Sequence, residues 1–245
     1  MTKLEVINPA TNEVLERLDY ATHEQINHQI KQAHQAFQNW KKVDAHERSA
    51  KLAQWAQLID DHQDELARLI TLEGGKPLAE AKGEVAYANS YVKWYAEEAK
   101  RVYGRTIPAN SPSKKIVIDK FPVGVVGAIT PWNFPAAMIT RKMAPALAAG
   151  CTIICKPAVK TPLTTIKLVE LAHQAGFPKD AISYIIASGK DAGDIFTNHS
   201  LISKLTFTGS TAVGKSLIES SAQQVKNVTM ELGGLAPLIV HNDAD

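Results

Sequence analysis

The sequence predicts an α/β fold, in which a doubly wound parallel sheet follows an N-terminal helical segment and a projecting β arm. From Val123 onward, short apolar runs rich in β-branched residues alternate with helical stretches. This alternation is typical of a parallel sheet that is covered by helices on both faces. The first third of the chain has helical periodicity instead, and a short charged stretch separates the two parts. With 245 residues, the chain is long enough to bury a sizeable core.

The helical part begins with recognisable start signals. Thr22 to Gln25 reads T-H-E-Q, a capping box, and apolar residues follow it at helical spacing. Asp44 starts a second helix, which we expect to run to the glycine pair at 74–75. A third helix begins near Pro77 and ends at Gly104.

The remaining elements follow in order. Residues 115–120 alternate and are charged at both ends, which indicates an edge strand or a projecting hairpin arm. The predicted strands of the main sheet are 123–129, 152–155, 182–187, 204–207, 225–231 and 237–240. The predicted helices between them are 135–149, 162–175, 191–198 and 211–221.

Composition excludes several functional classes. A net charge of +2 is too small to indicate nucleic acid or an anionic membrane as partner, and no apolar run is long enough to span a bilayer. No targeting segment is recognisable. Cys151 and Cys155 are too far apart along a strand to form a disulfide, so we expect a cytoplasmic protein. The histidines have no metal-binding spacing, and no metal site is expected.

Polar residues at the ends of the first two sheet strands are candidates for a ligand site, because ligands bind at the carboxyl edge of parallel sheets. Asn133 lies between Pro131 and Pro135, and such a fixed amide can donate a hydrogen bond to an oxyanion. Alternatively, Asn133 caps the helix that follows. Lys156 suits an anionic or hydroxyl-rich ligand such as a nucleotide ribose, or it is an ordinary surface lysine.

Two later strand ends add further candidates. Gly209 permits close approach of a ligand to the backbone, and the helix capped by Ser210 can bind phosphate at its N-terminus. The alternative is a generic strand-to-helix turn, since no G-x-G-x-x-G motif occurs. Glu231 precedes a Gly-Gly pair and is either a general base or an exposed strand-end acid. The two cysteines suit core packing better than nucleophilic catalysis.

Four of these motifs occur together in one order: P-W-N-F-P at 131–135, K-P at 156–157, F-T-G-S at 207–210 and E-L-G-G at 231–234. This combination resembles the aldehyde dehydrogenase superfamily over essentially the whole chain. Three longer segments resemble the succinate-semialdehyde dehydrogenases: G-K-P-L-A-E-A at 75–81, A-M-I-T-R-K at 137–142 and E-L-G-G-L-A-P at 231–237.

The resemblance implies a division of the chain. Residues 1–112 are expected to form the N-terminal helical part of a Rossmann-like cofactor-binding domain, and 113–122 an oligomerisation arm. Residues 123–232 are expected to form the dinucleotide-binding core, and 233–245 the start of a catalytic domain. A homo-oligomer, either a dimer or a tetramer, is expected for the complete form.

The resemblance also implies an activity, the NAD(P)-dependent oxidation of a small-molecule aldehyde to a carboxylic acid, with succinate semialdehyde as the expected substrate. A cysteine attacks the aldehyde, Asn133 holds the oxyanion, and Glu231 activates water for hydrolysis of the thioester. Arg141 falls on the position that pairs with the substrate carboxylate. The implied cofactor residues are Ile129, Thr130, Trp132, Lys156, Val159, Gly189, Phe207, Gly209, Ser210, Val213 and Leu232.

Two departures from the family pattern refine these expectations. Val159 replaces a glutamate that is frequent in NAD-preferring members, which predicts use of NADP or of both cofactors. The family's G-Q-x-C-type segment, which carries the nucleophilic cysteine, does not occur in the 245 residues. We therefore expect a truncated enzyme that is inactive alone. The alternatives are a non-catalytic dinucleotide-binding fragment, or a dehydrogenase for another aldehyde such as glutarate semialdehyde.

Overall fold

The computed structural model describes residues 3–244, so residues 1–2 and 245, at the outer ends of the first and last predicted segments, lie outside the described residues. The first elements are β1 (Lys3–Ile7), β2 (Val14–Asp19), α1 (His23–Trp40), α2 (Ala45–Asp61), α3 (Gln63–Gly74), α4 (Leu78–Glu98), the 3-10 helix η1 (Ala99–Arg101), β3 (Arg105–Pro108) and β4 (Lys115–Ile118). The elements that follow are β5 (Val125–Ile129), α5 (Ala137–Ala148), β6 (Thr152–Lys156), α6 (Leu163–Gln174), β7 (Ile182–Tyr184), α7 (Gly189–Asn198), β8 (Ile202–Gly209), α8 (Thr211–Ala222) and β9 (Asn227–Leu232).

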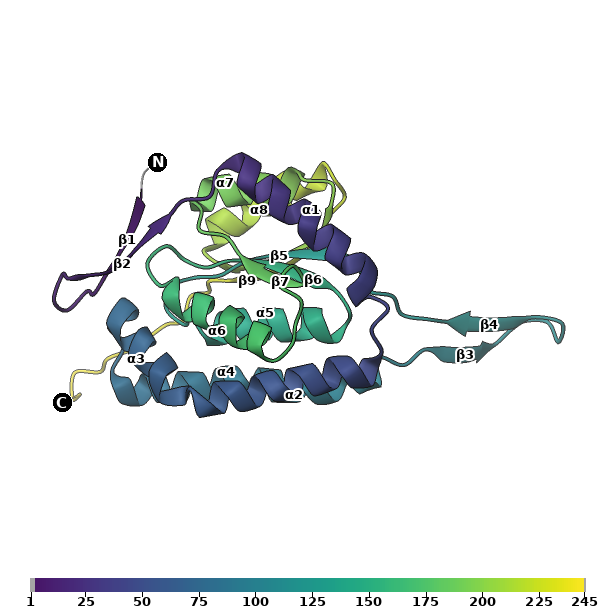
Figure 1. The fold of residues 1–245 in the computed structure, drawn as a ribbon, viewed down its shortest axis with the longest axis horizontal. Coiled ribbons are helices and arrows are strands. Elements are labelled where there is room, and N and C mark those ends of the chain that lie inside the picture. Colours follow the sequence, from purple (N-terminus) through teal and green to yellow (C-terminus); the bar gives the residue numbers. More distant parts are fainter. Residues whose placement is uncertain (1–2, 245) are drawn as a thin grey trace.

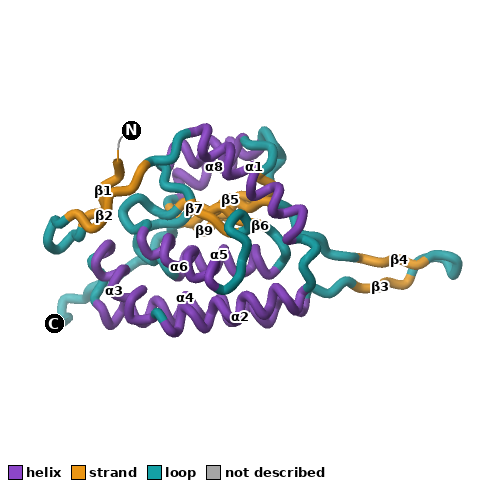
Figure 2. The backbone as a smooth tube through the Cα atoms, in the orientation of Figure 1, coloured by secondary structure: helices purple, strands orange, loops and turns teal. Residues whose placement is uncertain are grey.

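Five parallel strands form the central sheet in the order β7-β6-β5-β8-β9. Helices α1, α7 and α8 cover one face and α5 and α6 the other, with α2, α3 and α4 packed outside α5 and α6 (Figure 1). Figure 2 shows the strands of this sheet as one layer between the helical layers. The predicted α/β class, with its doubly wound parallel sheet, is confirmed.

The central strand β5 is apolar along its whole length because both of its faces are covered. All five residues of β5 are buried. Since successive side chains of a strand point to opposite faces, Val126 and Ala128 join the core beneath α5 and α6. Val125 and Ile129 join the core beneath α1 and α7. The continuous apolar runs in the sequence therefore reflect burial on both sides of the sheet.

The chain diverges at the carboxyl edge between two neighbouring strands. The loop after β5 leads to α5 on one face, whereas the loop after β8 leads to α8 on the opposite face (Figure 1). A crevice forms where neighbouring strands send their connections to opposite faces. The topology thus places the ends of β5, β6 and β8 around one opening.

Several elements differ from the sequence-based expectation. The predicted helix from Asp44 to the 74–75 glycine pair is two helices, α2 and α3, which are separated at His62. His62 departs from helical geometry, with φ −106° and ψ 18°. The capping box at Thr22 is present as predicted. Residues 237–240 form no strand, and their apolar side chains are exposed because no described strand pairs with them.

Two hairpins lie outside the main sheet. Strands β1 and β2 pair before the first helix, within a segment that the sequence predicted to be helical. Strands β3 and β4 pair antiparallel and project from the body of the molecule (Figure 1). Because β3 begins at Arg105, the arm starts before residue 113 and takes its first strand from the predicted helical part.

None of the helices in residues 3–244 combines the length and the apolarity needed to cross a membrane.

Candidate active site

A crevice of about 590 Å³ lies at the carboxyl edge of the sheet. It is bounded by the ends of β5, β6 and β8 and by the first turns of α7 and α8. The structure brings together almost all of the residues expected to contact the cofactor: Ile129, Thr130, Trp132, Lys156, Val159, Gly189, Phe207, Gly209, Ser210 and Val213. Leu232 is not part of this lining and packs against α8 instead, where an added Cβ on Gly214 would lie 2.4 Å from the Leu232 Cδ2 atom.

Lys156 provides a buried cationic group in the crevice. It is the last residue of β6, and only 6% of its surface is exposed, which rules out an ordinary surface lysine. Burial lowers the pKa of its ammonium. Desolvation is the only cause of this shift, so no charged group among residues 3–244 lies close enough to offset it. Since a buried unpaired charge is costly, Lys156 fits an anionic or hydroxyl-rich ligand that enters the crevice.

Two helix N-termini open into the same crevice. Ser210 caps α8 by accepting a hydrogen bond from the backbone N–H of Val213. Ser188 caps α7 by accepting one from the backbone N–H of Asp191. Helix N-termini carry partial positive charge and free N–H groups, which suit phosphate oxygens. Gly209 packs closely beside them: an added Cβ would lie 2.4 Å from the Cζ atom of the Phe207 ring, so the ring would have to shift.

Glu231 and Arg141, which the sequence assigned separate roles, contact each other. The Nη2 atom of Arg141 lies 3.0 Å from Glu231 Oε1. Thr208, a residue of the crevice lining, donates a hydrogen bond of 3.1 Å to the other carboxylate oxygen. The guanidinium also lies 5.3 Å from the centre of the Tyr91 ring. Glu231 is therefore positioned by partners rather than being an isolated strand-end acid.

A second cavity, of about 310 Å³, lies beside this ion pair. Arg141, Lys142 and Glu231 contribute to its lining. The Lys142 ammonium donates a hydrogen bond of 3.1 Å to Thr206 Oγ1. Burial lowers the pKa of Lys142 to about 8, although the nearby Glu231 carboxylate opposes this shift. This lysine was not predicted as a site residue from the sequence.

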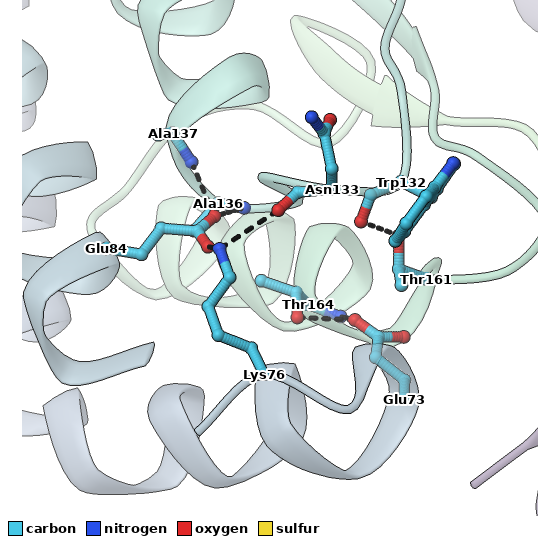
Figure 3. A network of polar contacts seen from close by, with 9 residues as sticks. All are labelled: Glu73, Lys76, Glu84, Trp132, Asn133, Ala136, Ala137, Thr161 and Thr164. Atoms are coloured by element: carbon cyan, nitrogen blue, oxygen red, sulfur yellow. Dashed lines mark hydrogen bonds and ion pairs between the residues drawn. The ribbon is translucent and has the colours of Figure 1, made fainter. Parts of the chain in front are cut away.

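Asn133 lies on the turn between β5 and α5, next to Trp132 but outside the crevice lining. Its backbone oxygen accepts a hydrogen bond of 2.9 Å from Lys76, whereas its carboxamide points away from this network (Figure 3). The alternative role as a helix cap is wrong, because the Glu84 carboxylate accepts the hydrogen bonds from Ala136 and Ala137 at the start of α5. The carboxamide is exposed and has no hydrogen-bond partner among the described residues.

The two cysteines are not suited to nucleophilic attack. Both are free and buried, and burial raises the pKa of each thiol. A nucleophilic cysteine needs the opposite environment, one that is partly exposed and favours the thiolate. Across the described part of the chain, no three His, Cys, Asp or Glu side chains lie close enough together to hold a metal ion.

Charged residues of the helical layer that support the site were not predicted from the sequence. Glu84 occupies a position in the buried stripe of α4, among Ala81, Val85 and Ala88. A carboxylate at a core position of an amphipathic helix was a detectable signal, because such a group requires partners. Glu73 at the end of α3 carries the same signal.

The chain matches known proteins along its full length. The model of the aldehyde dehydrogenase family matches residues 1–245. Among curated relatives, the chain is 52% identical over 242 residues to a glutarate-semialdehyde dehydrogenase of Pseudomonas putida, covering 99% of this chain and 50% of the relative. It is 48% identical to the NADP(+) succinate-semialdehyde dehydrogenase GabD of Escherichia coli, with the same coverage. It is 51% identical to a 3-sulfolactaldehyde dehydrogenase of Pseudomonas putida, covering 98% of this chain and 49% of the relative.

Solved structures agree with these matches. The crystal structure of a succinate-semialdehyde dehydrogenase from Burkholderia pseudomallei superposes with a TM-score of 0.95 at 49% identity, covering 100% of this chain and 51% of the other. The chain thus spans about half the length of the relatives it matches. Because the family model matches all of its residues and a curated relative shares 52% sequence identity with it, this chain belongs to the aldehyde dehydrogenase family.

Proposed function

We propose that this chain binds NADP or NAD in the crevice and forms the cofactor-binding part of a longer enzyme that oxidises a negatively charged aldehyde, with succinate semialdehyde as the first candidate. The observation that carries the proposal is the largely buried Lys156, with no charged group near enough to shift its pKa, which lines the same crevice as the capped N-termini of α7 and α8. Together these groups offer a hydroxyl-binding cation and two phosphate-binding helix ends.

Four groups of the site have separate roles in the proposed reaction. When bound, the nicotinamide cofactor supplies a hydride acceptor. The Lys156 ammonium holds ribose hydroxyls, and the first turn of α8 holds phosphate oxygens. The free carboxamide of Asn133 donates a hydrogen bond to the oxyanion that forms on the substrate carbonyl. Glu231 takes a proton from the water that releases the acid product.

We place the nucleophilic cysteine in a segment beyond residues 1–245, which the longer relatives have room to contain. The buried thiols of Cys151 and Cys155 support this placement, because neither favours the thiolate. The 245-residue chain alone is therefore expected to bind the cofactor without oxidising aldehydes. In the complete protein, the projecting β3–β4 arm offers edges for pairing with a second subunit.

Arg141 is the proposed anchor for the negative charge of the substrate. Glutarate semialdehyde, succinate semialdehyde and 3-sulfolactaldehyde, for which the three relatives are named, all carry an anionic group. The guanidinium of Arg141 can form two parallel hydrogen bonds with such a group. Because Arg141 is paired with Glu231 here, substrate binding would exchange one carboxylate partner for another and free Glu231 to act as a base.

NADP use is supported by the charges around Val159. An uncharged side chain at this position does not repel a 2′-phosphate. Lys160 adds a positive charge to the lining and lies 5.4 Å from the centre of the Trp132 ring. We therefore expect NADP to bind at least as tightly as NAD.

Isothermal titration of this chain with NADP tests the cofactor site directly. Lys156→Met is expected to raise the Kd at least tenfold, because a hydrogen bond to a charged group contributes about 1.5–3 kcal/mol. Lys167→Met is the matched control, since Lys167 pairs with Glu65 on the helical layer away from the crevice. Absence of dinucleotide binding by the unmodified chain, or a Kd of the Lys156 variant within twofold of it, would refute the proposed site.

A further inference from the structure

The turn that carries Asn133 is held by side chains from other segments of the chain. It runs from the end of β5 to the start of α5. Thr161 Oγ1 donates a hydrogen bond of 3.1 Å to the backbone oxygen of Trp132, and Lys76 donates one of 2.9 Å to the backbone oxygen of Asn133 (Figure 3). Consecutive carbonyl groups of the turn are thereby held in place.

Lys76 is the cation of this arrangement. It lies just before α4, and only 14% of its side chain is exposed. Its ammonium is paired with Glu84 and lies 3.8 Å from the centre of the Phe134 ring. The same ammonium thus contacts the backbone of Asn133 and the aromatic ring of the next residue, which leaves the turn little freedom to rotate.

Glu84 is the matching anion. Its side chain is 1% exposed, and one of its oxygens accepts hydrogen bonds of 2.9 and 3.3 Å from the backbone N–H groups of Ala136 and Ala137. Helix α5 has no cap from a side chain of its own N-cap residue. Glu84 therefore caps α5 from α4 and, through Lys76, connects that cap to Asn133 (Figure 3).

Burial of such a pair is weak evidence for a gain in stability, because desolvation of two charges offsets most of their attraction. The pair instead fixes the orientation of Asn133. With its backbone oxygen held toward Lys76, Asn133 presents its carboxamide on the opposite side of the turn (Figure 3). An oxyanion donor must be held in place before the reaction to be effective.

We propose that Lys76 and Glu84 are positioning residues for Asn133, which hold its carboxamide in the orientation needed to bind the substrate oxyanion. The inference rests on the proposed function. It assigns a catalytic consequence to two residues that contact neither the crevice nor the ion pair of Arg141 and Glu231.

The test uses the longer polypeptide that the proposed function requires. Lys76→Met and Glu84→Gln are each expected to lower kcat for aldehyde oxidation about tenfold, which is less than the 10²- to 10³-fold loss typical when an oxyanion donor is removed. The KM for the cofactor is expected to stay within twofold, because the crevice lining is untouched. Lys76→Arg, which keeps a cationic donor, is expected to recover part of the loss. Lys167→Met, which breaks another ion pair between helices, is the control and should leave kcat unchanged.

A double-mutant cycle with Asn133→Ala separates positioning from a general loss of structure. If Lys76 acts through the carboxamide, Lys76→Met should lower kcat less than twofold once that carboxamide is gone. Equal losses in both backgrounds, or no loss from either single variant, would overturn the inference while leaving the proposed function intact. Lack of aldehyde oxidation by the unmodified enzyme would instead overturn the proposed function, and the inference with it.

A variant that fails to fold is recognised independently of turnover. Amide hydrogen exchange of the 245-residue chain reports on the backbone N–H groups of Ala136 and Ala137, which donate hydrogen bonds to Glu84. In Lys76→Met, faster exchange should be confined to this turn. If exchange accelerates throughout the sheet, the loss of activity is a folding defect. Glu84→Gln, which keeps an acceptor oxygen and nearly the same volume, then decides the inference by the same double-mutant cycle.

Discussion

Replacing Glu73 by glutamine is expected to make the protein more stable at alkaline pH relative to the unmodified chain. Glu73 lies at the end of α3 and is only 3% exposed. Its carboxyl group accepts a hydrogen bond of 2.7 Å from the backbone N–H of Leu163. It also accepts one of 2.9 Å from the backbone N–H of Thr164 and one from the Thr164 hydroxyl (Figure 3). It therefore caps α6 from the helical layer.

Burial raises the pKa of Glu73 from its ordinary value of 4.5 to about 7, although its hydrogen bonds oppose the shift. A pKa raised by folding means that the folded state binds this proton more tightly than the unfolded state does. The corresponding stabilisation is complete below pH 4.5 and is lost as the pH rises through 7. At 1.36 kcal/mol per pKa unit, the total is about 3 kcal/mol.

The assay is urea denaturation of both proteins at pH 5 and at pH 8. Glu73→Gln stays neutral at both pH values. The free energy of unfolding of this variant minus that of the unmodified chain should therefore increase by about 2–3 kcal/mol from pH 5 to pH 8. Other carboxyl groups titrate in both proteins and cancel in the difference. Glu80→Gln, at an exposed position in the first turn of α4, is the control and should shift by less than ~1 kcal/mol. A pH-independent difference, or one that grows in favour of Glu73, would show that the hydrogen bonds outweigh desolvation.

Three other changes test the site and the core. In the longer polypeptide, Arg141→Ala should lower kcat/KM for succinate semialdehyde at least tenfold, because this substrate loses a charge-assisted contact. The kcat/KM for an uncharged aldehyde should fall less than threefold. A loss below threefold for both substrates would exclude Arg141 as the anchor. Gly209→Ala should weaken NADP binding about tenfold in titration calorimetry, because its methyl group displaces the Phe207 ring, and an unchanged Kd would contradict this close packing. Trp55→Phe removes a buried hydrogen bond of 3.0 Å to the backbone oxygen of Leu168. It should lower the free energy of unfolding by about 1–3 kcal/mol in urea denaturation. A loss below ~0.5 kcal/mol would show that this bond contributes little to stability.

The parts of the fold that the sequence predicted are those whose signal is local. The apolar runs of β5 and β6 predicted strands buried on both faces, and the Thr22 capping box predicted the start of α1. The β1–β2 hairpin was missed because β2 is mostly exposed and mixes charged with apolar residues, so its alternation is weak. The apolar residues at 237–240 have the composition of a strand, but a strand also needs a neighbour to pair with.

In the site, too, only the residues with a local sequence signal were predictable. Lys156, Gly209 and Ser210 were predictable because they end or follow strands, and the topology of a parallel sheet places all such positions at one edge. The ion pair between Arg141 and Glu231 was not predictable, because it joins α5 to β9, at the opposite end of the α/β segment. Pairings of this kind depend on packing angles between elements, which spacing along the chain does not encode.

The two carboxylates that cap helices from outside also bear on the order in which this molecule folds. Glu84 reaches a backbone N–H 52 positions later in the chain, and Glu73 reaches one 90 positions later. Contacts so distant in sequence form slowly, because closing a long loop costs entropy before any bond repays it. The strands can associate through their own apolar faces, but the starts of α5 and α6 are capped only when the helical layer has docked. A species that has already collapsed around the sheet would therefore lack these caps, and amide protection at Ala136 and Ala137 should recover during refolding later than secondary structure does.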